Sequence, residues 1–349
     1  LKRAQRMMQD ADLSALLLTT EPEIRYFTGF LTRFWESPTR PWFVVVPVSG
    51  DPIAVIPAIG AHLMRQSWIT DIRTWRAPDY TDDGIGLLSD TLLDLTNPSD
   101  KIGVPDQMES HVRMPLSALH ALEQKIKPRR MASDMAIVRR LRMIKSEPEI
   151  TKISTACAIA ERAFARVPEI AQIGVPLSKV FRHFQALCLE EGADWVPYLA
   201  GAAAQGGYGD VISPPDASPL AAGDILMLDT GLICDGYHCD FDRNWAIGHA
   251  SDLARRAYDT LFAATEAGLS AAKPGNTMRD LFDAMSSEIK TLDLSGGDIG
   301  RLGHGLGMQL TEQPSIATFD TTVLCENMTI TLEPSLSYGD GQMMVHEEN

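Results

Sequence analysis

The sequence predicts an α+β protein of two domains, and three observations support this fold class. Short apolar runs alternate with helical stretches in the first part of the chain. A capping box opens a long amphipathic helix near the middle. An Asp-Gly pair between two strand-like runs predicts an antiparallel hairpin in the second half. With 349 residues, 45% of them hydrophobic, the chain is long enough for two cores of ordinary size.

The first domain, residues 1–140, is predicted to be an α/β domain. Its strand-like runs are short and apolar, and they alternate with helical stretches. The predicted strands are 15–18, 42–46 and 52–56, and the predicted helices are 86–95 and 116–126. The basic segment 125–130 and the segment 131–143 that follows it are expected to connect the two domains.

The second domain, residues 141–349, begins with a strong helix signal. Ser146 and Glu149 have the spacing of a capping box. Apolar residues then recur at steps of three and four, as on one face of a helix, at Ile150, Ile153, Cys157, Ala160 and Phe164. Further helices are predicted at 177–191, 252–271 and 278–292, and strands at 225–232, 237–247 and 328–333. This pattern predicts helices packed on a mostly antiparallel sheet.

Composition excludes several classes of protein. The formal net charge of -15 is spread over short acidic clusters, and no basic stripe could neutralise the phosphates of a nucleic acid. No apolar run reaches the roughly 18 residues that cross a bilayer, so no membrane partner is expected. The five cysteines form no CxxC pair, which predicts free thiols in a reducing compartment, with the cytoplasm as the expected location. Because the sequence begins at Leu1 and ends at Asn349 directly after an acidic pair, we expect residues to be missing at both ends.

The predicted hairpin brings several acidic residues together. If Asp235 and Gly236 are the turn, position 234 faces 237, and the pairs further out are Gly231 with Asp240 and Asp229 with Asp242. Since side chains alternate between the two faces of a strand, one face then carries Asp229, Asp240 and Asp242, with His238 at the near end.

Three carboxylates within reach of one another repel unless a cation neutralises them. The sequence therefore predicts a metal site on this hairpin, and Gly231, which has no side chain, would leave room for an ion opposite Asp240. The alternative is a solvated polar face on an edge hairpin.

Three more candidate ligands follow in the sequence. His304 lies in the glycine-rich segment 303–307, where the backbone can approach an ion closely. Glu333 ends a predicted strand, 328–333, whose alternate residues are apolar, and Glu347 similarly follows an apolar run. Four carboxylates and one imidazole suit Mn²⁺, Co²⁺, Fe²⁺ or Zn²⁺. Bridging carboxylates would hold two such divalent ions about 3.5–4 Å apart.

These residues resemble the ligand pattern of the pita-bread metallopeptidases, the family of prolidase, aminopeptidase P, methionine aminopeptidase and the metal-free creatinase. The family pattern is an Asp, a second Asp eleven residues on, a His in HG.G, a Glu in T.EP and a final Glu, which correspond to Asp229, Asp240, His304, Glu333 and Glu347. The segments 24–30 and 145–150 are similar to the start of the family's two domains. The resemblance implies an N-terminal α/β creatinase-like domain followed by a pita-bread catalytic domain.

The resemblance also implies roles for these residues. Asp229 would chelate one ion, Asp240 and Glu347 would bridge, and His304 and Glu333 would serve the other ion. The implied reaction is hydrolysis of an amide bond in a small peptide, most like an Xaa-Pro bond, with Glu333 as the catalytic proton carrier and His238 as a second catalytic candidate. Members of this branch are commonly homodimers, and the aromatic segment 32–38 with Trp35 would either reach the partner or lie in the core.

Four positions depart from the family pattern. The two histidines that contact substrate are replaced by Ile212 and Thr311, an Arg is replaced by Val345, and a Thr is replaced by Asp242. Asp242 would add a further acid beside the metals or a general base. These departures favour an alternative, a creatinase-like C–N hydrolase or a lyase that acts on a small nitrogenous or sulfonium metabolite. A third interpretation is a binding module that has lost catalysis.

Overall fold

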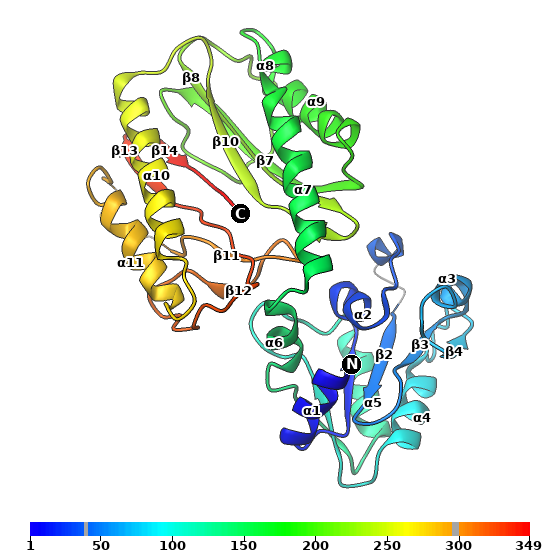
Figure 1. Cartoon of the computed structure of the whole chain (residues 1–349). Coiled ribbons are helices and arrows are strands. Elements are labelled where there is room, and N and C mark those ends of the chain that lie inside the picture. Colours follow the sequence, from blue (N-terminus) through cyan, green and yellow to red (C-terminus); the bar gives the residue numbers. More distant parts are fainter. Residues whose placement is uncertain (38–40, 295–299) are drawn as a thin grey trace. The chain divides into compact units, whose positions relative to one another are not determined.

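The computed structural model describes residues 1–37, 41–294 and 300–349. The chain divides into two compact units, Leu1–Arg142 and Met143–Asn349 (Figure 1). Each unit has its own hydrophobic core, and each is described by itself below. No helix in the described part of the chain is both long enough and apolar enough to cross a membrane.

The first unit is built on one mixed six-stranded sheet with the strand order β4-β3-β2-β1-β5-β6. The pairs β3–β4, β1–β5 and β5–β6 are parallel, whereas β1–β2 and β2–β3 are antiparallel. The strands are β1 (Ala15–Leu18), β2 (Phe43–Pro47), β3 (Ile53–Pro57), β4 (Asp71–Trp75), β5 (Lys101–Val104) and β6 (Arg130–Ser133). The helices are α1 (Lys2–Asp10), α2 (Glu21–Thr28), η1 (Phe34–Glu36), η2 (Ala58–Gly60), α3 (Ala61–Met64), α4 (Ile85–Leu95), α5 (Leu116–Lys125) and α6 (Ile137–Met143).

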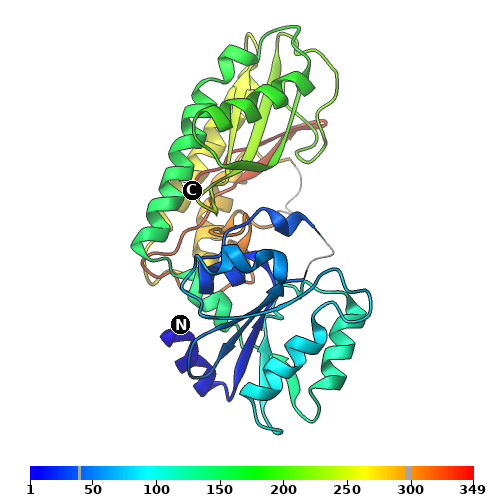
Figure 2. The ribbon, with the colours of Figure 1, turned by 90° about the vertical axis from the view of Figure 1, so that its right-hand side faces the viewer.

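Helices cover both faces of this sheet, as Figure 2 shows. Alternate residues of β1 belong to two different cores because side chains of a strand alternate between its faces. Leu16 and Leu18 pack with residues of α1, α2, α3 and α6. Ala15 and Leu17 pack with residues of α4 and α5. The predicted α/β architecture of the first domain is therefore confirmed.

The prediction that 125–143 is only a connector is wrong. Its middle forms β6, the last strand of the sheet, and its end forms α6. The Asp134 carboxylate accepts hydrogen bonds from the backbone N–H groups of Ala136 and Val138, which fixes the start of that helix. Ile137 and Leu141 then enter the core. A four-residue strand is too short to show an alternating pattern, so its sequence signal was weak.

The aromatic segment before β2 provides core side chains. Trp35 is only 9% exposed, and its ring lies 5.8 Å from that of Trp42. The Arg113 guanidinium lies 5.3 Å above the Trp35 ring and donates hydrogen bonds to the backbone carbonyls of Trp35 and Ser37. Of the two interpretations of Trp35, the structure therefore supports the core interpretation.

The second unit contains an antiparallel sheet with the order β10-β8-β7, in which the short β9 also pairs with β8. Its strands are β7 (Trp195–Gln205), β8 (Asp224–Cys234), β9 (Tyr237–His238), β10 (Phe241–Ala246), β11 (His304–Gly305), β12 (Glu312–Ser315), β13 (Ser335–Gly339) and β14 (Gln342–Val345). Its helices are α7 (Glu147–Ala165), α8 (Val167–Ile170), α9 (Leu177–Glu190), α10 (Asp252–Ala271) and α11 (Met278–Ile289). The mostly antiparallel sheet and the main helices were predicted, and the α+β class is confirmed.

Helices pack on both faces of this second sheet (Figure 1). Leu226 and Leu228 of β8 belong to the core that contains residues of α7 and α9. Helix α7 begins at the predicted capping box of Ser146. Ile225 and Met227 belong to the core of α10 and α11. The odd-numbered positions of β8, which include Asp229, therefore face the α10 side.

The predicted strand 328–333 is wrong in detail. Three of its residues form isolated bridges, in which Met328 pairs with Ile144, Ile330 with Gly305, and Leu332 with Glu348. Thr331, which alternates with these apolar residues, is fully buried. A segment that pairs with three different partners is covered on both sides, so simple alternation did not describe it.

Candidate metal centre

The acidic hairpin forms with the predicted register. Asp235 and Gly236 have φ values of 45° and 69°, and two successive positive φ values are those of a type I′ hairpin turn. Across this turn Cys234 pairs with Tyr237, and further out Asp229 pairs with Asp242. The turn chemistry therefore places two aspartates opposite each other on the face of the sheet that carries Asp229.

The space beside Gly231, which was predicted to leave room for an ion, is filled by a side chain. A Cβ atom at this position would lie 2.1 Å from Leu310 Cδ1. The leucine side chain therefore occupies the space that was assigned to an ion. Gly231 lets the segment around Leu310 pack against the carboxylate hairpin, so the prediction that the missing side chain leaves open space there is wrong.

Three side chains from distant parts of the sequence come together next to this hairpin. Potential ligand atoms of Asp240, His304 and Glu347 all lie within 4.8 Å of one another. The His304 Nε2 atom lies 3.5 Å from Asp240 Oδ2 and 4.0 Å from Glu333 Oε2. Asp240, His304 and Glu347 are buried, whereas the side chain of Glu333 is 33% exposed.

Backbone pairing explains how these residues meet. The N–H of Thr331 donates to the carbonyl of His304 over 2.7 Å. The N–H of Leu332 donates to the carbonyl of Glu348 over 2.8 Å. The segment that ends in Glu333 therefore lies between His304 and Glu347. Gly303 makes this possible, since its φ is 137° and a Cβ there would lie 2.2 Å from the carbonyl oxygen of Thr331.

The imidazole of His304 is oriented by its own turn. Its Nδ1 atom lies 2.9 Å from the carbonyl oxygen of Gly305, so Nδ1–H is the donor and Nε2 keeps its lone pair. Burial lowers the pKa of His304 to about 4. A neutral imidazole with one nitrogen held by a backbone carbonyl is the usual arrangement of a metal-binding histidine.

The carboxyl groups resist ionisation. Burial, followed by the charge of Glu333, raises the pKa of Asp229 to about 7. Burial, followed by the charges of Asp229 and Glu333, raises the pKa of Asp240 to about 9. Burial is also the first cause of the raised pKa values of Asp242, Glu333 and Glu347. A divalent cation would remove this electrostatic cost.

Unsatisfied oxygens provide an independent test of whether a cation fits. Among the described residues, the buried atoms Asp229 Oδ1, Asp242 Oδ1 and Glu347 Oε1 have no hydrogen-bond partner. Buried carboxylate oxygens without donors are costly. The donor set and its unsatisfied oxygens fit a divalent metal ion that prefers oxygen ligands with one imidazole.

The sequence did not indicate two residues that contact this group, nor a third whose charge acts on it. Tyr198 of β7 donates its hydroxyl to Asp229 Oδ2 over 3.0 Å. The side-chain amide of Asn349 accepts from the backbone N–H of Asp240 over 2.9 Å and donates to its carbonyl. Arg301 is exposed, and its charge opposes the rise in the pKa of Asp240 that burial causes. The Arg301-Leu-Gly-His304 spacing was the available signal for the arginine.

The four departures from the family pattern occupy different surroundings. Ile212 is 81% exposed, on the loop after β7. Thr311 accepts a 3.4 Å hydrogen bond from Arg301 Nη2, so a guanidinium contacts the residue that stands in place of a family histidine. Val345 is buried. Asp242 lies opposite Asp229.

His238, the second catalytic candidate, is not part of the group of potential ligands formed by Asp240, His304 and Glu347. It pairs with Ile233, and its backbone N–H donates to the carbonyl of Gly307 over 2.8 Å. This bond joins the hairpin to the glycine-rich turn that carries His304. His238 is half-buried.

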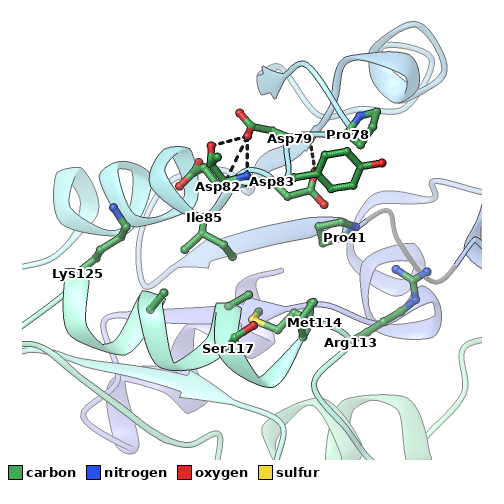
Figure 3. Close-up of a pocket in the computed structure, with 15 residues that line it drawn as sticks. Pro41, Pro78, Asp79, Asp82, Asp83, Ile85, Arg113, Met114, Ser117 and Lys125 are labelled. Atoms are coloured by element: carbon green, nitrogen blue, oxygen red, sulfur yellow. Dashed lines mark hydrogen bonds between the residues drawn. The ribbon is translucent and has the colours of Figure 1, made fainter.

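A cavity lies in the first unit, with a volume of about 700 Å³ (Figure 3). Its wall includes Ile85, Met114 and the acidic residues Asp79, Asp82 and Asp83. The carboxylates of these three aspartates accept hydrogen bonds within their own loop or from nearby residues. All the residues that line this cavity belong to the first unit.

Comparisons with known proteins agree with this architecture. A model of the creatinase/prolidase N-terminal domain matches residues 1–144, and a model of metallopeptidase family M24 matches residues 151–349. A probable dipeptidase, PepE, from Mycobacterium tuberculosis is 29% identical over 339 residues, which cover 94% of this chain and 84% of that protein. An Xaa-Pro dipeptidase from Pyrococcus furiosus is 31% identical over 203 residues, which cover 57% of this chain and 58% of that protein.

Solved structures share the whole fold. Prolidase from Thermococcus sibiricus superimposes with a TM-score of 0.87 at 20% identity, covering 99% of this chain and 91% of that one. Dipeptidase PepE from Mycobacterium ulcerans gives a TM-score of 0.84 at 25% identity, covering 99% of this chain and 90% of that one. The predicted order of a creatinase-like domain and a pita-bread domain is confirmed.

Proposed function

Because the chain belongs to metallopeptidase family M24 and is a metallohydrolase, we propose that it hydrolyses an amide bond in small peptides of the Xaa-Pro type. The observation that carries this proposal is the buried group of Asp240, His304 and Glu347, with Glu333 at its edge. The names of two relatives, a probable dipeptidase and an Xaa-Pro dipeptidase, support the substrate class.

The proposed metal ligands are the five residues of the sequence pattern. They are Asp229, Asp240, His304, Glu333 and Glu347, and they would hold two divalent ions of Mn, Co, Fe or Zn. The unsatisfied oxygens of Asp229 and Glu347 and the neutral imidazole of His304 support this assignment. When bound, such ions supply Lewis acidity, which activates water and polarises a carbonyl group near neutral pH.

The chain's own residues supply orientation and proton transfer. The side chain of Glu333 is 33% exposed, and its Oε2 atom lies 4.0 Å from His304 Nε2. We assign Glu333 to carry a proton from water to the leaving nitrogen, because its carboxylate adjoins both the buried ligands and the solvent side. Tyr198 orients Asp229 through its hydroxyl. His238, near the turn of His304, is the alternative proton donor.

One observation favours a second candidate function. The positions of the two family histidines hold Ile212 and Thr311, and Arg301 donates to the Thr311 hydroxyl. A guanidinium recognises anionic groups in a planar, two-pronged geometry that an imidazole does not offer. This arrangement suits a creatinase-like C–N hydrolase or a lyase that acts on a small charged nitrogenous metabolite.

A substrate panel separates these functions. The metal-loaded protein is incubated with Xaa-Pro dipeptides and, in parallel, with guanidino, betaine and cyclic amide metabolites. Chelator-treated protein and the Glu333→Gln variant are the controls. Chelator-reversible turnover of the dipeptides supports the first function, and turnover of the metabolites alone supports the second. No turnover of either set would overturn both.

We also propose a cytoplasmic homodimer in which the N-terminal domain, residues 1–140, contributes to dimerisation and to substrate access. The free thiols of all five cysteines support a reducing compartment. The superposition with the Thermococcus prolidase covers 99% of this chain and 91% of that one, and the N-terminal family model matches residues 1–144, so both family domains are present. Light scattering measures the oligomeric state, and a monomer at working concentration would contradict this assembly.

A further inference from the structure

We propose that Asp242 is a sixth metal ligand, which forms a cation position with Asp229 and Glu347 beside the position of Asp240, His304 and Glu347. This inference deepens the proposed function, because it concerns the same metal centre. It assigns a role to the aspartate that stands where related peptidases carry a threonine. It also predicts which kind of metal ion the centre prefers.

The location of Asp242 is fixed by the sheet. It pairs with Asp229 across the antiparallel strands β8 and β10. Directly opposite residues on the same face of a sheet have Cβ atoms about 4.5–5.5 Å apart. Asp242 is 1% exposed, so water does not solvate its carboxylate freely.

Each of these carboxylates has an oxygen without a donor. Tyr198 donates to Asp229 Oδ2, and Asp229 Oδ1 has no partner among the described residues. The backbone N–H of Glu347 donates to the Asp242 carboxylate, and Asp242 Oδ1 has no partner in the same part of the chain. Glu347 Oε1 is likewise without a partner there. Asp242 thus adjoins Asp229 across the two strands and the backbone of Glu347, and a bound cation would satisfy the orphaned oxygens of these three residues.

Arg243 follows Asp242 directly, but its hydrogen bonds go to other groups. Its guanidinium donates to the backbone carbonyls of Asp242 and Glu347, each over 2.7 Å. It also forms an ion pair with Glu348 over 2.9 Å. Arg243 therefore holds the chain around Glu347 in place and leaves the Asp242 carboxylate oxygen available for another positive group.

The charge balance leads to the kind of ion. The carboxylates of Asp229, Asp240, Asp242, Glu333 and Glu347 carry five negative charges when ionised, against four positive charges on two divalent ions. Asp242 also adds an oxygen ligand to a set that contains only one nitrogen. Oxygen-rich sites with many ligands suit Mn²⁺ better than Zn²⁺, which prefers four ligands and nitrogen or sulfur donors. The centre should therefore select Mn²⁺ over Zn²⁺ more strongly than it would without Asp242.

The test compares the wild-type chain with Asp242→Asn and Asp242→Thr. Both variants keep an acceptor for the Glu347 N–H, and the second introduces the residue of related peptidases. Asp224→Asn is the matched control, because Asp224 is a buried aspartate at the start of β8 whose two oxygens already accept from Gln205 and Ala221. Apoprotein is titrated with Mn²⁺, and bound metal is measured by elemental analysis.

We expect two bound Mn²⁺ in the wild type and in the control. The Asp242 variants should bind the second Mn²⁺ about 10–100-fold more weakly or lose it. Their apoproteins should melt no lower than the wild-type apoprotein, because a buried like charge has been removed, and Mn²⁺ should raise their melting temperature less. Unchanged affinity for both ions in either folded variant overturns the proposal, as does a wild type that binds only one ion. A wild type that binds no divalent metal overturns the proposed function as well.

Discussion

Two acidic clusters in this molecule have opposite electrostatic character. Asp79, Asp82 and Asp83 lie in a loop of the first unit, beside the cavity of Figure 3. Asp229, Asp240 and Asp242 lie on the hairpin of the second unit. Hydrogen bonding lowers the pKa of Asp79, with the Thr81 hydroxyl as the first cause, whereas burial raises the pKa values of the hairpin aspartates.

The difference lies in where the donors come from. The Asp82 carboxylate accepts from the backbone N–H of Gly86 at the start of α4, and Asp83 accepts from the indole of Trp75. All three carboxylates accept hydrogen bonds within the first unit, and none of their oxygens is a buried atom without a partner in the described part of the chain, so this cluster shapes a loop. On the hairpin, Asp229 Oδ1 and Asp242 Oδ1 lack donors among the described residues. Accounting for hydrogen bonds therefore separates an acidic cluster that shapes the chain from one that suits a ligand.

The largest expected effect is on turnover. Glu333→Gln keeps the shape of the side chain but removes the proton carrier, so the rate of amide hydrolysis should fall about 10²–10⁴-fold. Because Glu333 is also a proposed metal ligand, turnover is measured at saturating Mn²⁺, and elemental analysis checks that the variant carries the metal. The matched change in the other cluster, Asp82→Asn, should leave turnover unaltered. Full activity in Glu333→Gln would contradict the assignment of Glu333 as the proton carrier.

The next effect is a loss of stability with rising pH, to which the hairpin cluster contributes and the loop cluster does not. The folded apoprotein holds Asp229 with a pKa of about 7 and Asp240 with a pKa of about 9, both above the ordinary value. The folded state therefore binds more protons than the unfolded state between about pH 4 and 9, and its stability falls as the pH rises through this window.

Thermal melting of the apoprotein from pH 5 to 9 tests this sign. The melting temperature should fall steadily without metal and should change much less with saturating Mn²⁺, because bound cations stabilise the ionised carboxylates. Asp79 contributes with the opposite sign, since its lowered pKa gives stability that is lost only as the pH falls below its ordinary range. An apoprotein whose stability rises with pH would contradict the contrast between the clusters.

Local rules in the sequence predicted much of the hairpin cluster. The register that pairs Asp229 with Asp242 follows from the Asp235-Gly236 turn and from strand alternation, both of which act over a few residues. The segments that carry His304 and Glu333 could be found only by resemblance to a family pattern, because their meeting depends on backbone pairing between distant segments.

Contacts between distant segments also explain what the sequence did not predict. Tyr198 lies on β7, a strand that contains Pro197 and Gly201 and has no clear apolar alternation. The use of Gly231 was misjudged because the position of Leu310 depends on how a distant loop folds. The donors of a functional cluster come from elsewhere in the fold, so their absence or presence is visible only in three dimensions.

A smaller effect is expected from Tyr198, whose hydroxyl orients Asp229. Tyr198→Phe removes the 3.0 Å hydrogen bond to Asp229 Oδ2 and leaves that oxygen without its donor. Loss of such a supporting hydrogen bond typically weakens metal binding about 10–100-fold. Competition with a fluorescent chelator measures the affinity for Mn²⁺. Unchanged affinity would mean that the tyrosine serves only the fold, and the apoprotein melting temperature would show that role.

The smallest effect should come from the satisfied cluster. Asp82→Asn keeps an acceptor for the Gly86 N–H but removes a negative charge at the start of α4. A charge near a helix N-terminus contributes about 0.3–1 kcal/mol, so the free energy of unfolding should fall by about that amount in urea titrations. The loss should be the same with and without Mn²⁺, because the Asp82 oxygens already have donors and no cation replaces them. If Mn²⁺ stabilised the wild type more than the Asp82→Asn variant, this loop would also bind a cation. Hydrogen bonding of the carboxylate oxygens would then not distinguish the loop cluster from the hairpin cluster.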